Sequence, residues 1–221
     1  MFFRKVSLHC IQATGLVRID HFRGFEAYWE EIPAEEESAI NGRWVKADGD
    51  ALFGRLHQVF GRLPLVAEDL GVITPEVDAL RRRHRLPGMK VLQFAFSGEP
   101  DNPYLPHRHS CDSVVYTGTH DNDTTLGWYR SLDQESRDYL DDYLGRPGEP
   151  MPWPLIRTAL ASRSELAIVP LQDLLGLDGE HRMNLPGTAE GNWGWRFSWK
   201  QVEPELAGRV RHLVEMYGRS T

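Results

Sequence analysis

Residues 17–23 read VRIDHFR, and this stretch joins an apolar strand pattern to a dense group of charges. Its apolar residues are typical of a short buried strand, whereas Arg18, Asp20 and His21 bring polar and charged groups to the end of that strand. Side chains two positions apart on a strand point to the same face, so Arg18 and Asp20 are predicted to lie side by side. A strand that ends in this way indicates a functional site.

Four more apolar runs follow along the chain, and amphipathic helical patterns separate them. The runs lie at 63–69, 89–96, 113–119 and 165–173, and the helical patterns lie at 3–14, 48–61, 74–85, 134–145 and 201–220. Strands that alternate with helices predict an α/β fold built on a parallel sheet. Residues 133–165 contain two helical stretches before the last strand, and we expect them to form an inserted lid.

The charge of the chain narrows the range of partners. Its 221 residues carry a formal net charge of −7, so no basic field exists that would attract nucleic acid or an anionic membrane surface. The basic cluster RRRHR at residues 81–85 ends a predicted helix and is interpreted as a solvated last turn. We therefore expect neither a nucleic acid nor a membrane as partner.

The compartment is predicted from what the chain lacks. No apolar run approaches the roughly 20 residues that cross a bilayer, and no signal peptide is recognisable at the N-terminus. The two cysteines, Cys10 and Cys111, have no C-x-x-C spacing and are interpreted as ordinary buried thiols. We expect a cytoplasmic protein.

Three of the five apolar runs end in acidic residues, namely Asp20, the pair Glu68 and Asp69, and the pair Asp121 and Asp123. The C-terminal ends of parallel strands converge on the active site in α/β folds. Carboxylates gathered there repel one another, and their burial is costly unless cations or hydrogen bonds compensate. The cluster therefore needs a chemical function to explain it.

A metal site is the first interpretation of this cluster, because Asp, Glu and His bind magnesium, calcium or zinc. The sequence HRH at residues 107–109 adds support to it. Against a metal, Arg18 lies close to Asp20 and His120 adjoins Asp121, so these acids already have partners. An arginine keeps a neighbouring carboxylate ionised, which suits a nucleophile better than a ligand that competes for a cation. We expect no metal.

Glycoside chemistry is the second interpretation. It needs one ionised carboxylate as nucleophile and one protonated carboxyl group as general acid. Asp20, held anionic by Arg18, fits the first role. Glu68 follows the apolar sequence LPLVA, which would desolvate the carboxyl group and raise its pKa towards that of a working acid.

Aromatic residues are frequent around these segments, and their rings are suited to stacking on the apolar faces of sugars. Trp44, Phe96 and Trp128 are instead interpreted as core residues. The aromatic content alone does not decide between a binding site and a core.

Six motifs, in this order, resemble the amylomaltase family, which comprises the 4-α-glucanotransferases or disproportionating enzymes of the α-amylase clan. They are VRIDHFRGFEAYWEEIPA (17–34, with one additional glutamate), AEDLGVITPEV (67–77), PGMKVLQFAF (87–96), VVYTGTHDNDTT (114–125), RMNLPGT (182–188) and GNWGWR (191–196). The resemblance covers the chain from about residue 15 to its end. It implies a (β/α)8 barrel, a retaining double displacement and no organic cofactor. The implied partners are α-1,4-glucans, maltooligosaccharides and glucose.

The resemblance also implies roles for single residues. Asp20 matches the nucleophile, Glu68 the acid/base, and Asp121 the carboxylate that binds the hydroxyls of the distorted sugar. The residues expected to bind substrate are Arg18, His21, Tyr28, Asp69, Phe94, His120, Asn192 and Trp193.

The chain departs from the family in length, since family members are about twice as long. The expected fold is therefore the C-terminal part of a (β/α)8 TIM barrel, with about five parallel strands in one partial domain (1–221) and the helical insertion at 133–165. We expect strand edges at 16–20 and 165–170 to be unpaired, which favours association with an N-terminal half or with a second copy.

Two alternatives remain open from the residues. An α-glucan hydrolase would use the same carboxylates, because access of water separates hydrolysis from transfer in a retaining mechanism. A non-catalytic glucan-binding remnant of the enzyme is the other alternative.

Overall fold

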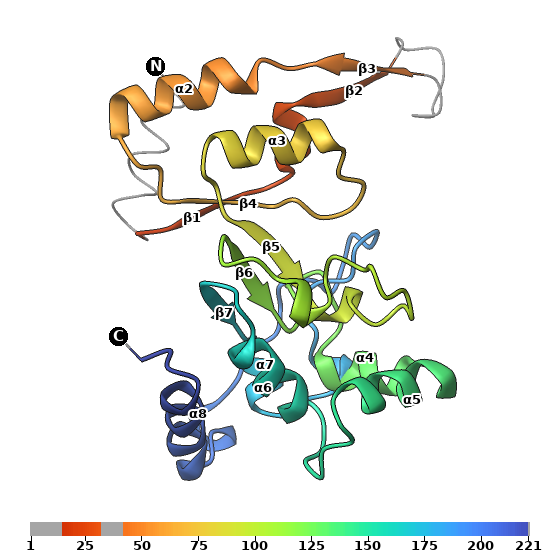
Figure 1. Ribbon diagram of the computed structural model, residues 1–221. Helices are drawn as coiled ribbons and strands as arrows, with labels where there is room; N and C mark the ends of the chain where they lie inside the picture. Colours follow the sequence, from red (N-terminus) through yellow and green to blue (C-terminus); the bar gives the residue numbers. More distant parts are fainter. Residues whose placement is uncertain (1–14, 32–41, 221) are drawn as a thin grey trace. The chain divides into compact units, whose positions relative to one another are not determined.

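The computed structural model describes residues 15–31 and 42–220 (Figure 1). The chain divides into two compact units, residues 1–89 and 90–221, which are described in turn.

The first unit is built on two parallel strands and two helices. β1 (Val17–Ile19) pairs with β4 (Leu65–Ala67), with Val17 opposite Leu65 and Ile19 opposite Ala67. The helices are α2 (Gly49–Phe60) and α3 (Pro75–Arg83), and the short 3-10 helix η1 (Phe22–Phe25) follows β1. Phe22, Phe53 and Val77 are fully buried in the core that these elements share. The core thus fixes the strand ends from which Asp20 and Glu68 emerge.

An antiparallel hairpin in the first unit was not anticipated. β2 (Ala27–Glu31) pairs with β3 (Gly42–Lys46), as Figure 1 shows. The rings of Trp29 and Trp44 meet edge to face at 5.5 Å. Trp44 is 52% exposed, so its interpretation as a core residue was wrong. Charged residues make up part of both strands, which read AYWEE and GRWVK, and Tyr28, Trp29 and Trp44 are exposed, as in a solvated hairpin rather than a buried strand.

The second unit contains a sheet and most of the helices. β5 (Gly88–Val91), which starts in the first unit, is followed in the sheet by β6 (Ser113–Tyr116) and β7 (Leu166–Ile168), and β6 and β7 are parallel. The α-helices are α4 (Thr125–Ser131), α5 (Gln134–Tyr143), α6 (Trp153–Ala161), α7 (Leu171–Leu174) and α8 (Pro204–Met216). The 3-10 helices are η2 (Leu92–Phe94), η3 (Pro106–Arg108), η4 (Gly179–His181) and η5 (Trp199–Gln201).

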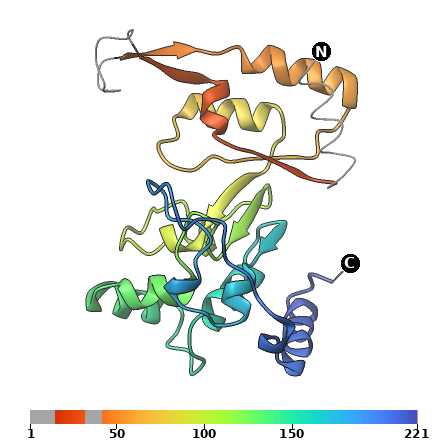
Figure 2. The same cartoon turned by 180° about the vertical axis from the view of Figure 1, so that it is seen from behind.

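Two buried clusters hold this unit together. The larger one gathers Leu92, Val115, Leu140 and Leu155 between the sheet and the helices, and Phe96 belongs to it with Trp128 packed against it. The smaller one joins α6 to α8 through Ile156 and Leu213 (Figure 2). The interpretation of Phe96 and Trp128 as core residues is thereby confirmed.

Most of the elements predicted from the apolar pattern are present. All five runs contain a strand, although the third continues into η2 and the fifth into α7. Helices lie at four of the predicted places, and residues 133–165 hold α5 and α6; α4 was not anticipated. The helix expected at 3–14 lies outside the described residues. The fold is of the α/β class, as predicted.

Two smaller predictions were wrong. Cys111 is exposed rather than buried, and Cys10 lies outside the described residues. The basic cluster at 81–85 is not uniformly solvated, because Arg81 and His84 are buried. Within residues 15–31 and 42–220, no helix is long and apolar enough to cross a membrane.

Candidate active site

The parallel register of β1 and β4 places two carboxylates at the same edge of the first unit. Asp20 directly follows β1, and Glu68 directly follows β4. The pairing continues past the strands, because the N–H of Glu68 donates to the carbonyl of Ile19 at 2.9 Å and the N–H of Phe22 donates to the carbonyl of Glu68 at 3.0 Å. Asp20 and Glu68 are therefore held as neighbours by the backbone.

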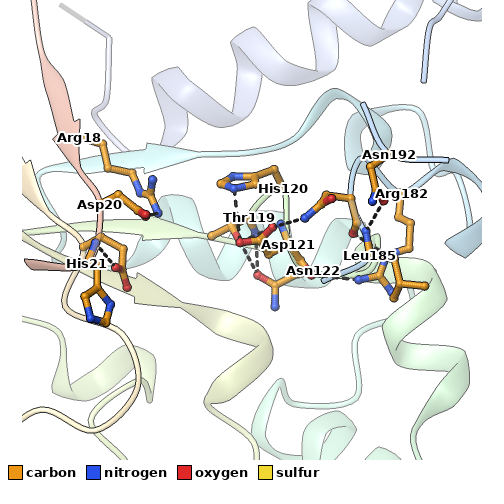
Figure 3. Close-up of polar contacts among 12 residues, drawn as sticks. Arg18, Asp20, His21, Thr119, His120, Asp121, Asn122, Arg182, Leu185 and Asn192 are labelled. Carbon is orange, nitrogen blue, oxygen red and sulfur yellow. Dashed lines mark hydrogen bonds and ion pairs between the residues drawn. The ribbon is translucent and has the colours of Figure 1, made fainter. Parts of the chain in front are cut away.

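Asp20 is paired with a cation and open to solvent. Nη2 of Arg18 donates to Oδ1 of Asp20 at 2.7 Å, and the Asp20 side chain is 76% exposed (Figure 3). The contact predicted from their spacing is present. An exposed carboxylate with a guanidinium on one oxygen leaves its other oxygen available to an electrophile.

Glu68 has neutral partners instead. Oε2 accepts a hydrogen bond from the backbone N–H of His21 at 2.7 Å, and Oε1 accepts one from the N–H of Leu70 at 2.9 Å. The side chain is half-buried, and Val66 and Ala67 before it are buried. Each carboxylate oxygen thus has one backbone donor, which fixes the plane of the group.

Asp69 points into the first unit. Oδ1 accepts the N–H of Met89 at 2.7 Å, and Oδ2 lies 3.2 Å from Nε of Arg81. The Asp69 side chain is only 11% exposed. A Cβ at Gly88 would come within 2.3 Å of Oδ2, so only glycine fits beside this carboxylate. Asp69 therefore connects the ends of β4, α3 and the start of β5.

Asp121 lies in the loop that joins β6 to α4 in the second unit. Nδ2 of Asn184 donates to its Oδ1 at 2.6 Å, and Nε2 of His120 lies 3.3 Å from its Oδ2 (Figure 3). Nη2 of Arg182 donates to the Asp121 carbonyl at 2.9 Å. The segment that contains Arg182 and Asn184 thus fixes both the backbone and the side chain of Asp121.

His120 and Trp193 border a pocket of about 190 Å³ in the second unit. Their rings lie 5.2 Å apart, and Trp193 is 56% exposed. Trp193 has a left-handed backbone, with φ at 61°, and its N–H donates to the carbonyl of Met183 at 2.8 Å. Asn192 does not border this pocket. Its Oδ1 accepts the N–H of Leu185 at 2.8 Å, and its Nδ2 donates to both oxygens of Thr188 at 3.0 Å. Asn192 thus stabilises the loop that presents Trp193.

The loop that carries Asp121 is supported by a buried acid, Asp173, at the end of the fifth apolar run. Its carboxylate accepts the hydroxyls of Thr117 and Thr125 at 2.6 and 2.7 Å and the N–H of Thr125 at 2.8 Å. Burial raises the pKa of Asp173, although the threonine donors oppose the rise. Asp173 therefore ties the end of β6 to the start of α4.

Sequence reasoning missed four residues that hold the candidate site together, namely Arg81, Asp173, Arg182 and Asn184. The last two lie in the RMNLPGT motif, which was noticed without a role. Asp173 ends an apolar run as Asp20 does, and that signal was available. No local pattern distinguishes Arg81 from its solvated neighbours.

The remaining predicted residues are placed as follows. Phe94 is partly exposed and meets Tyr104 edge to face at 5.6 Å, while Tyr28 is exposed on β2 and His21 is exposed after β1. In the described part of the chain, no group of three or more His, Cys, Asp or Glu side chains is arranged to hold a metal ion. Asp20 contacts Arg18, Glu68 accepts backbone N–H groups, and Asp121 contacts Asn184 and His120.

Comparison with known proteins identifies the family. The family profile described as 4-alpha-glucanotransferase matches residues 1–201. The chain belongs to the 4-alpha-glucanotransferase family. This result confirms the resemblance drawn from the six motifs.

Relatives of this 4-alpha-glucanotransferase family member are similar over nearly all of the chain. The chain is 53% identical to a 4-alpha-glucanotransferase of Thermus thermophilus, over 93% of the chain and 42% of that relative. It is 52% identical to a 4-alpha-glucanotransferase of Synechocystis, over 95% of the chain and 42% of that relative. The solved amylomaltase of Streptococcus agalactiae in complex with acarbose is 34% identical, with a TM-score of 0.91, over 96% of this chain and 43% of that one. The chain therefore spans about two fifths of the length of the curated relatives it matches.

Proposed function

We propose that the chain carries the catalytic carboxylates of a 4-α-glucanotransferase, which transfers α-1,4-glucan segments between maltooligosaccharides. The observation that carries this proposal is the placement of Asp20 and Glu68 at the ends of paired parallel strands, one beside a guanidinium and the other between two backbone donors. Retaining glycoside chemistry needs two carboxyl groups that differ in this way.

In the first step, Glu68 gives its proton to the glycosidic oxygen as the carboxylate of Asp20 attacks the anomeric carbon. The bond to the leaving glucan breaks, and a covalent glycosyl ester on Asp20 forms. In the second step, Glu68 takes the proton from the 4-hydroxyl of an acceptor glucan, whose oxygen attacks the same carbon and releases Asp20. Two inversions give net retention, and the enzyme is regenerated without a cofactor.

Asp121 is proposed to bind hydroxyls of the sugar at the cleavage site. Support comes from the rigid loop around it, because Asn184 and His120 orient the carboxylate and Arg182 holds its backbone. Trp193, exposed beside His120, offers a ring for stacking on a sugar face. The solved relative's complex with acarbose is consistent with a sugar-binding site in this family.

The other proposed substrate-binding residues divide into two kinds. Arg18, His21, Tyr28 and Phe94 are partly or fully exposed and are proposed to contact the glucan directly. Asp69 and Asn192 are engaged with their own unit through several hydrogen bonds. We propose that these two act on the substrate by holding Glu68 and Trp193 in place.

The elements are proposed to be part of one (β/α)8 barrel, with residues 133–165 as a helical insertion in a single domain. Two observations support this arrangement. The pairs β1–β4 and β6–β7 are parallel. The N–H of Ala67 in β4 donates to the carbonyl of Pro87, directly before β5, at 2.8 Å, as expected of neighbouring strands in one sheet. We also propose a cytoplasmic location.

The test is disproportionation of maltotriose, assayed with the chain alone and with a separately supplied N-terminal half. A ladder of longer maltooligosaccharides is expected, whereas glucose and maltose alone would indicate a hydrolase. Asp20→Asn and Glu68→Gln should each lower turnover at least about a hundredfold, since each removes a group that acts in the transition state. Asp142→Asn, which changes an exposed carboxylate on α5, is the matched control. Turnover within a few-fold of the parent for either catalytic variant would contradict the assignment.

A further inference from the structure

His21 has a backbone conformation that few residues with a side chain adopt. Its φ and ψ are 48° and 54°, in the left-handed region, directly between Asp20 and the helix η1. A non-glycine residue in this region is strained, and such strain persists where the surrounding contacts impose it. The imidazole does not account for it, because it is exposed and makes no hydrogen bond within the described residues.

The contacts of the His21 backbone do account for it. Its N–H donates to Oε2 of Glu68 at 2.7 Å, and its carbonyl accepts the N–H of Gly24 at 2.9 Å. On either side, the carbonyl of Ile19 and the N–H of Phe22 bind the backbone of Glu68. The left-handed turn at His21 lets the chain keep the backbone bonds of Ile19 and Phe22 to Glu68 while the N–H of His21 meets the Glu68 carboxylate.

We propose that His21 is a positioning residue for the acid/base. Its left-handed backbone, rather than its imidazole, aims an N–H at Oε2 of Glu68 and so couples the loop after Asp20 to the orientation of Glu68. This inference rests on the proposed function, because Glu68 is the acid/base there. It differs from the expected role of His21 as a side chain that binds substrate.

The consequence for catalysis is selective. If the N–H moves, Glu68 loses the donor on Oε2 and its proton is no longer aimed at the leaving oxygen. A displacement of about 1 Å in such an arrangement costs on the order of a hundredfold in rate. The loss falls on substrates whose leaving group needs a proton, and fluoride leaves without one. The release of fluoride in the first turnover, before Glu68 acts as a base in the second step, therefore reports the first step without proton donation by Glu68.

The first experiment compares two substitutions in an active preparation by the ratio of turnover on maltotriose to the single-turnover rate of fluoride release from α-maltosyl fluoride. Asparagine tolerates the left-handed region and valine does not. His21→Val should lower the ratio about 10- to 100-fold, whereas His21→Asn should keep it within about threefold, whatever either does to KM. Turnover of the fluoride also shows that a variant is folded. An equal decrease of this ratio in both variants, or an unchanged ratio in His21→Val, would overturn the proposal.

Glu68→Gln serves as the reference for the proposed function. It should lower the same ratio more than either His21 variant. If it slows maltotriose turnover and the single-turnover release of fluoride equally, the acid/base assignment fails, and this failure is distinct from that of the His21 proposal.

The second experiment needs no activity. Amide hydrogen exchange of the 221-residue chain is measured by NMR, with and without Glu68→Ala. Removal of the carboxylate should speed exchange at His21 and Leu70 at least about tenfold. Phe22, whose N–H binds the backbone carbonyl of Glu68, should stay protected and is the internal control. Unchanged exchange at His21 would show that its N–H is not held by the Glu68 side chain.

Discussion

Acidification is expected to destabilise the second unit through one buried histidine, His109. The residue is 2% exposed. Its Nε2–H donates to the carbonyl of Tyr104 at 2.9 Å, and its Nδ1 accepts the hydroxyl of Ser164 at 3.2 Å. Burial lowers the pKa of His109 from 6.5 to about 4; the hydrogen bond to Tyr104 opposes this shift and the positive charge of Lys90 adds to it. The folded unit therefore holds a neutral imidazole.

The direction of the change in stability with pH follows from which state, folded or unfolded, binds the proton at the higher pH. The unfolded chain protonates this imidazole near pH 6.5, whereas the folded chain does so only near pH 4. The stability that depends on the neutral ring is fully present above pH 6.5 and is lost as the pH falls towards 4. One pKa unit corresponds to about 1.4 kcal/mol, so the free energy of unfolding should fall by about 2 kcal/mol from pH 7 to pH 5 through His109 alone.

Urea denaturation followed by tryptophan fluorescence measures this loss. His109→Gln keeps an N–H donor for the Tyr104 carbonyl but does not titrate, so the stability advantage of the parent over the variant should shrink by about 2 kcal/mol between the two pH values. The contributions of other titrating groups to the stability are the same in both proteins and cancel in this difference. His107→Gln, at an exposed position two residues away, retains His109 and should keep the parent's loss. A constant difference between parent and His109→Gln would show that the folded unit accepts the proton, with Ser164 as the new acceptor.

Two other predictions concern the second unit. Asp173→Ala leaves three buried donors of Thr117 and Thr125 without an acceptor and should lower the free energy of unfolding by about 3 kcal/mol. Asp173→Asn, whose amide the threonine hydroxyls can bind, should lower it by less than about 1 kcal/mol. Equal losses for the two variants in urea denaturation would contradict this account. Leu166 and Ile168 are 42% and 43% exposed on β7, which in the described residues pairs with β6 alone, so the double change to lysine should reduce concentration-dependent light scattering, and undiminished scattering would place association elsewhere.

The features that the sequence predicted are those with a local or periodic signal. Each apolar run contains a strand, and the spacing of Arg18 and Asp20 is enough to predict their contact, because alternate residues of a strand share a face. The α/β class follows from the alternation itself. These predictions succeeded because period and propensity act over a few residues.

The features that it did not predict depend on residues far apart along the chain. Asn184 binds Asp121 across 63 positions, and Asp173 binds Thr117 across 56. The hairpin of β2 and β3 was missed because its strands contain few apolar residues, most of them aromatic, and these residues show no clear alternation along the sequence. In sequence Arg81 resembles its solvated neighbours, but its guanidinium is buried against Asp69 at the end of β4 and the carbonyl of Leu86.

The roles proposed for Asp20 and Glu68 rest on the different partners of the two side chains. If the proposed function holds, a bound glucan would remove water from both carboxylates, and each would then depend on the partners that the protein supplies. Asp20 keeps a full positive charge on Arg18 at 2.7 Å, whereas Glu68 keeps only the dipoles of two backbone N–H groups. In a site of low dielectric constant a charge stabilises an anion more than two dipoles do, and like charges resist joint ionisation. This difference in partners supports the proposal of Asp20 as the nucleophile and Glu68 as the acid/base.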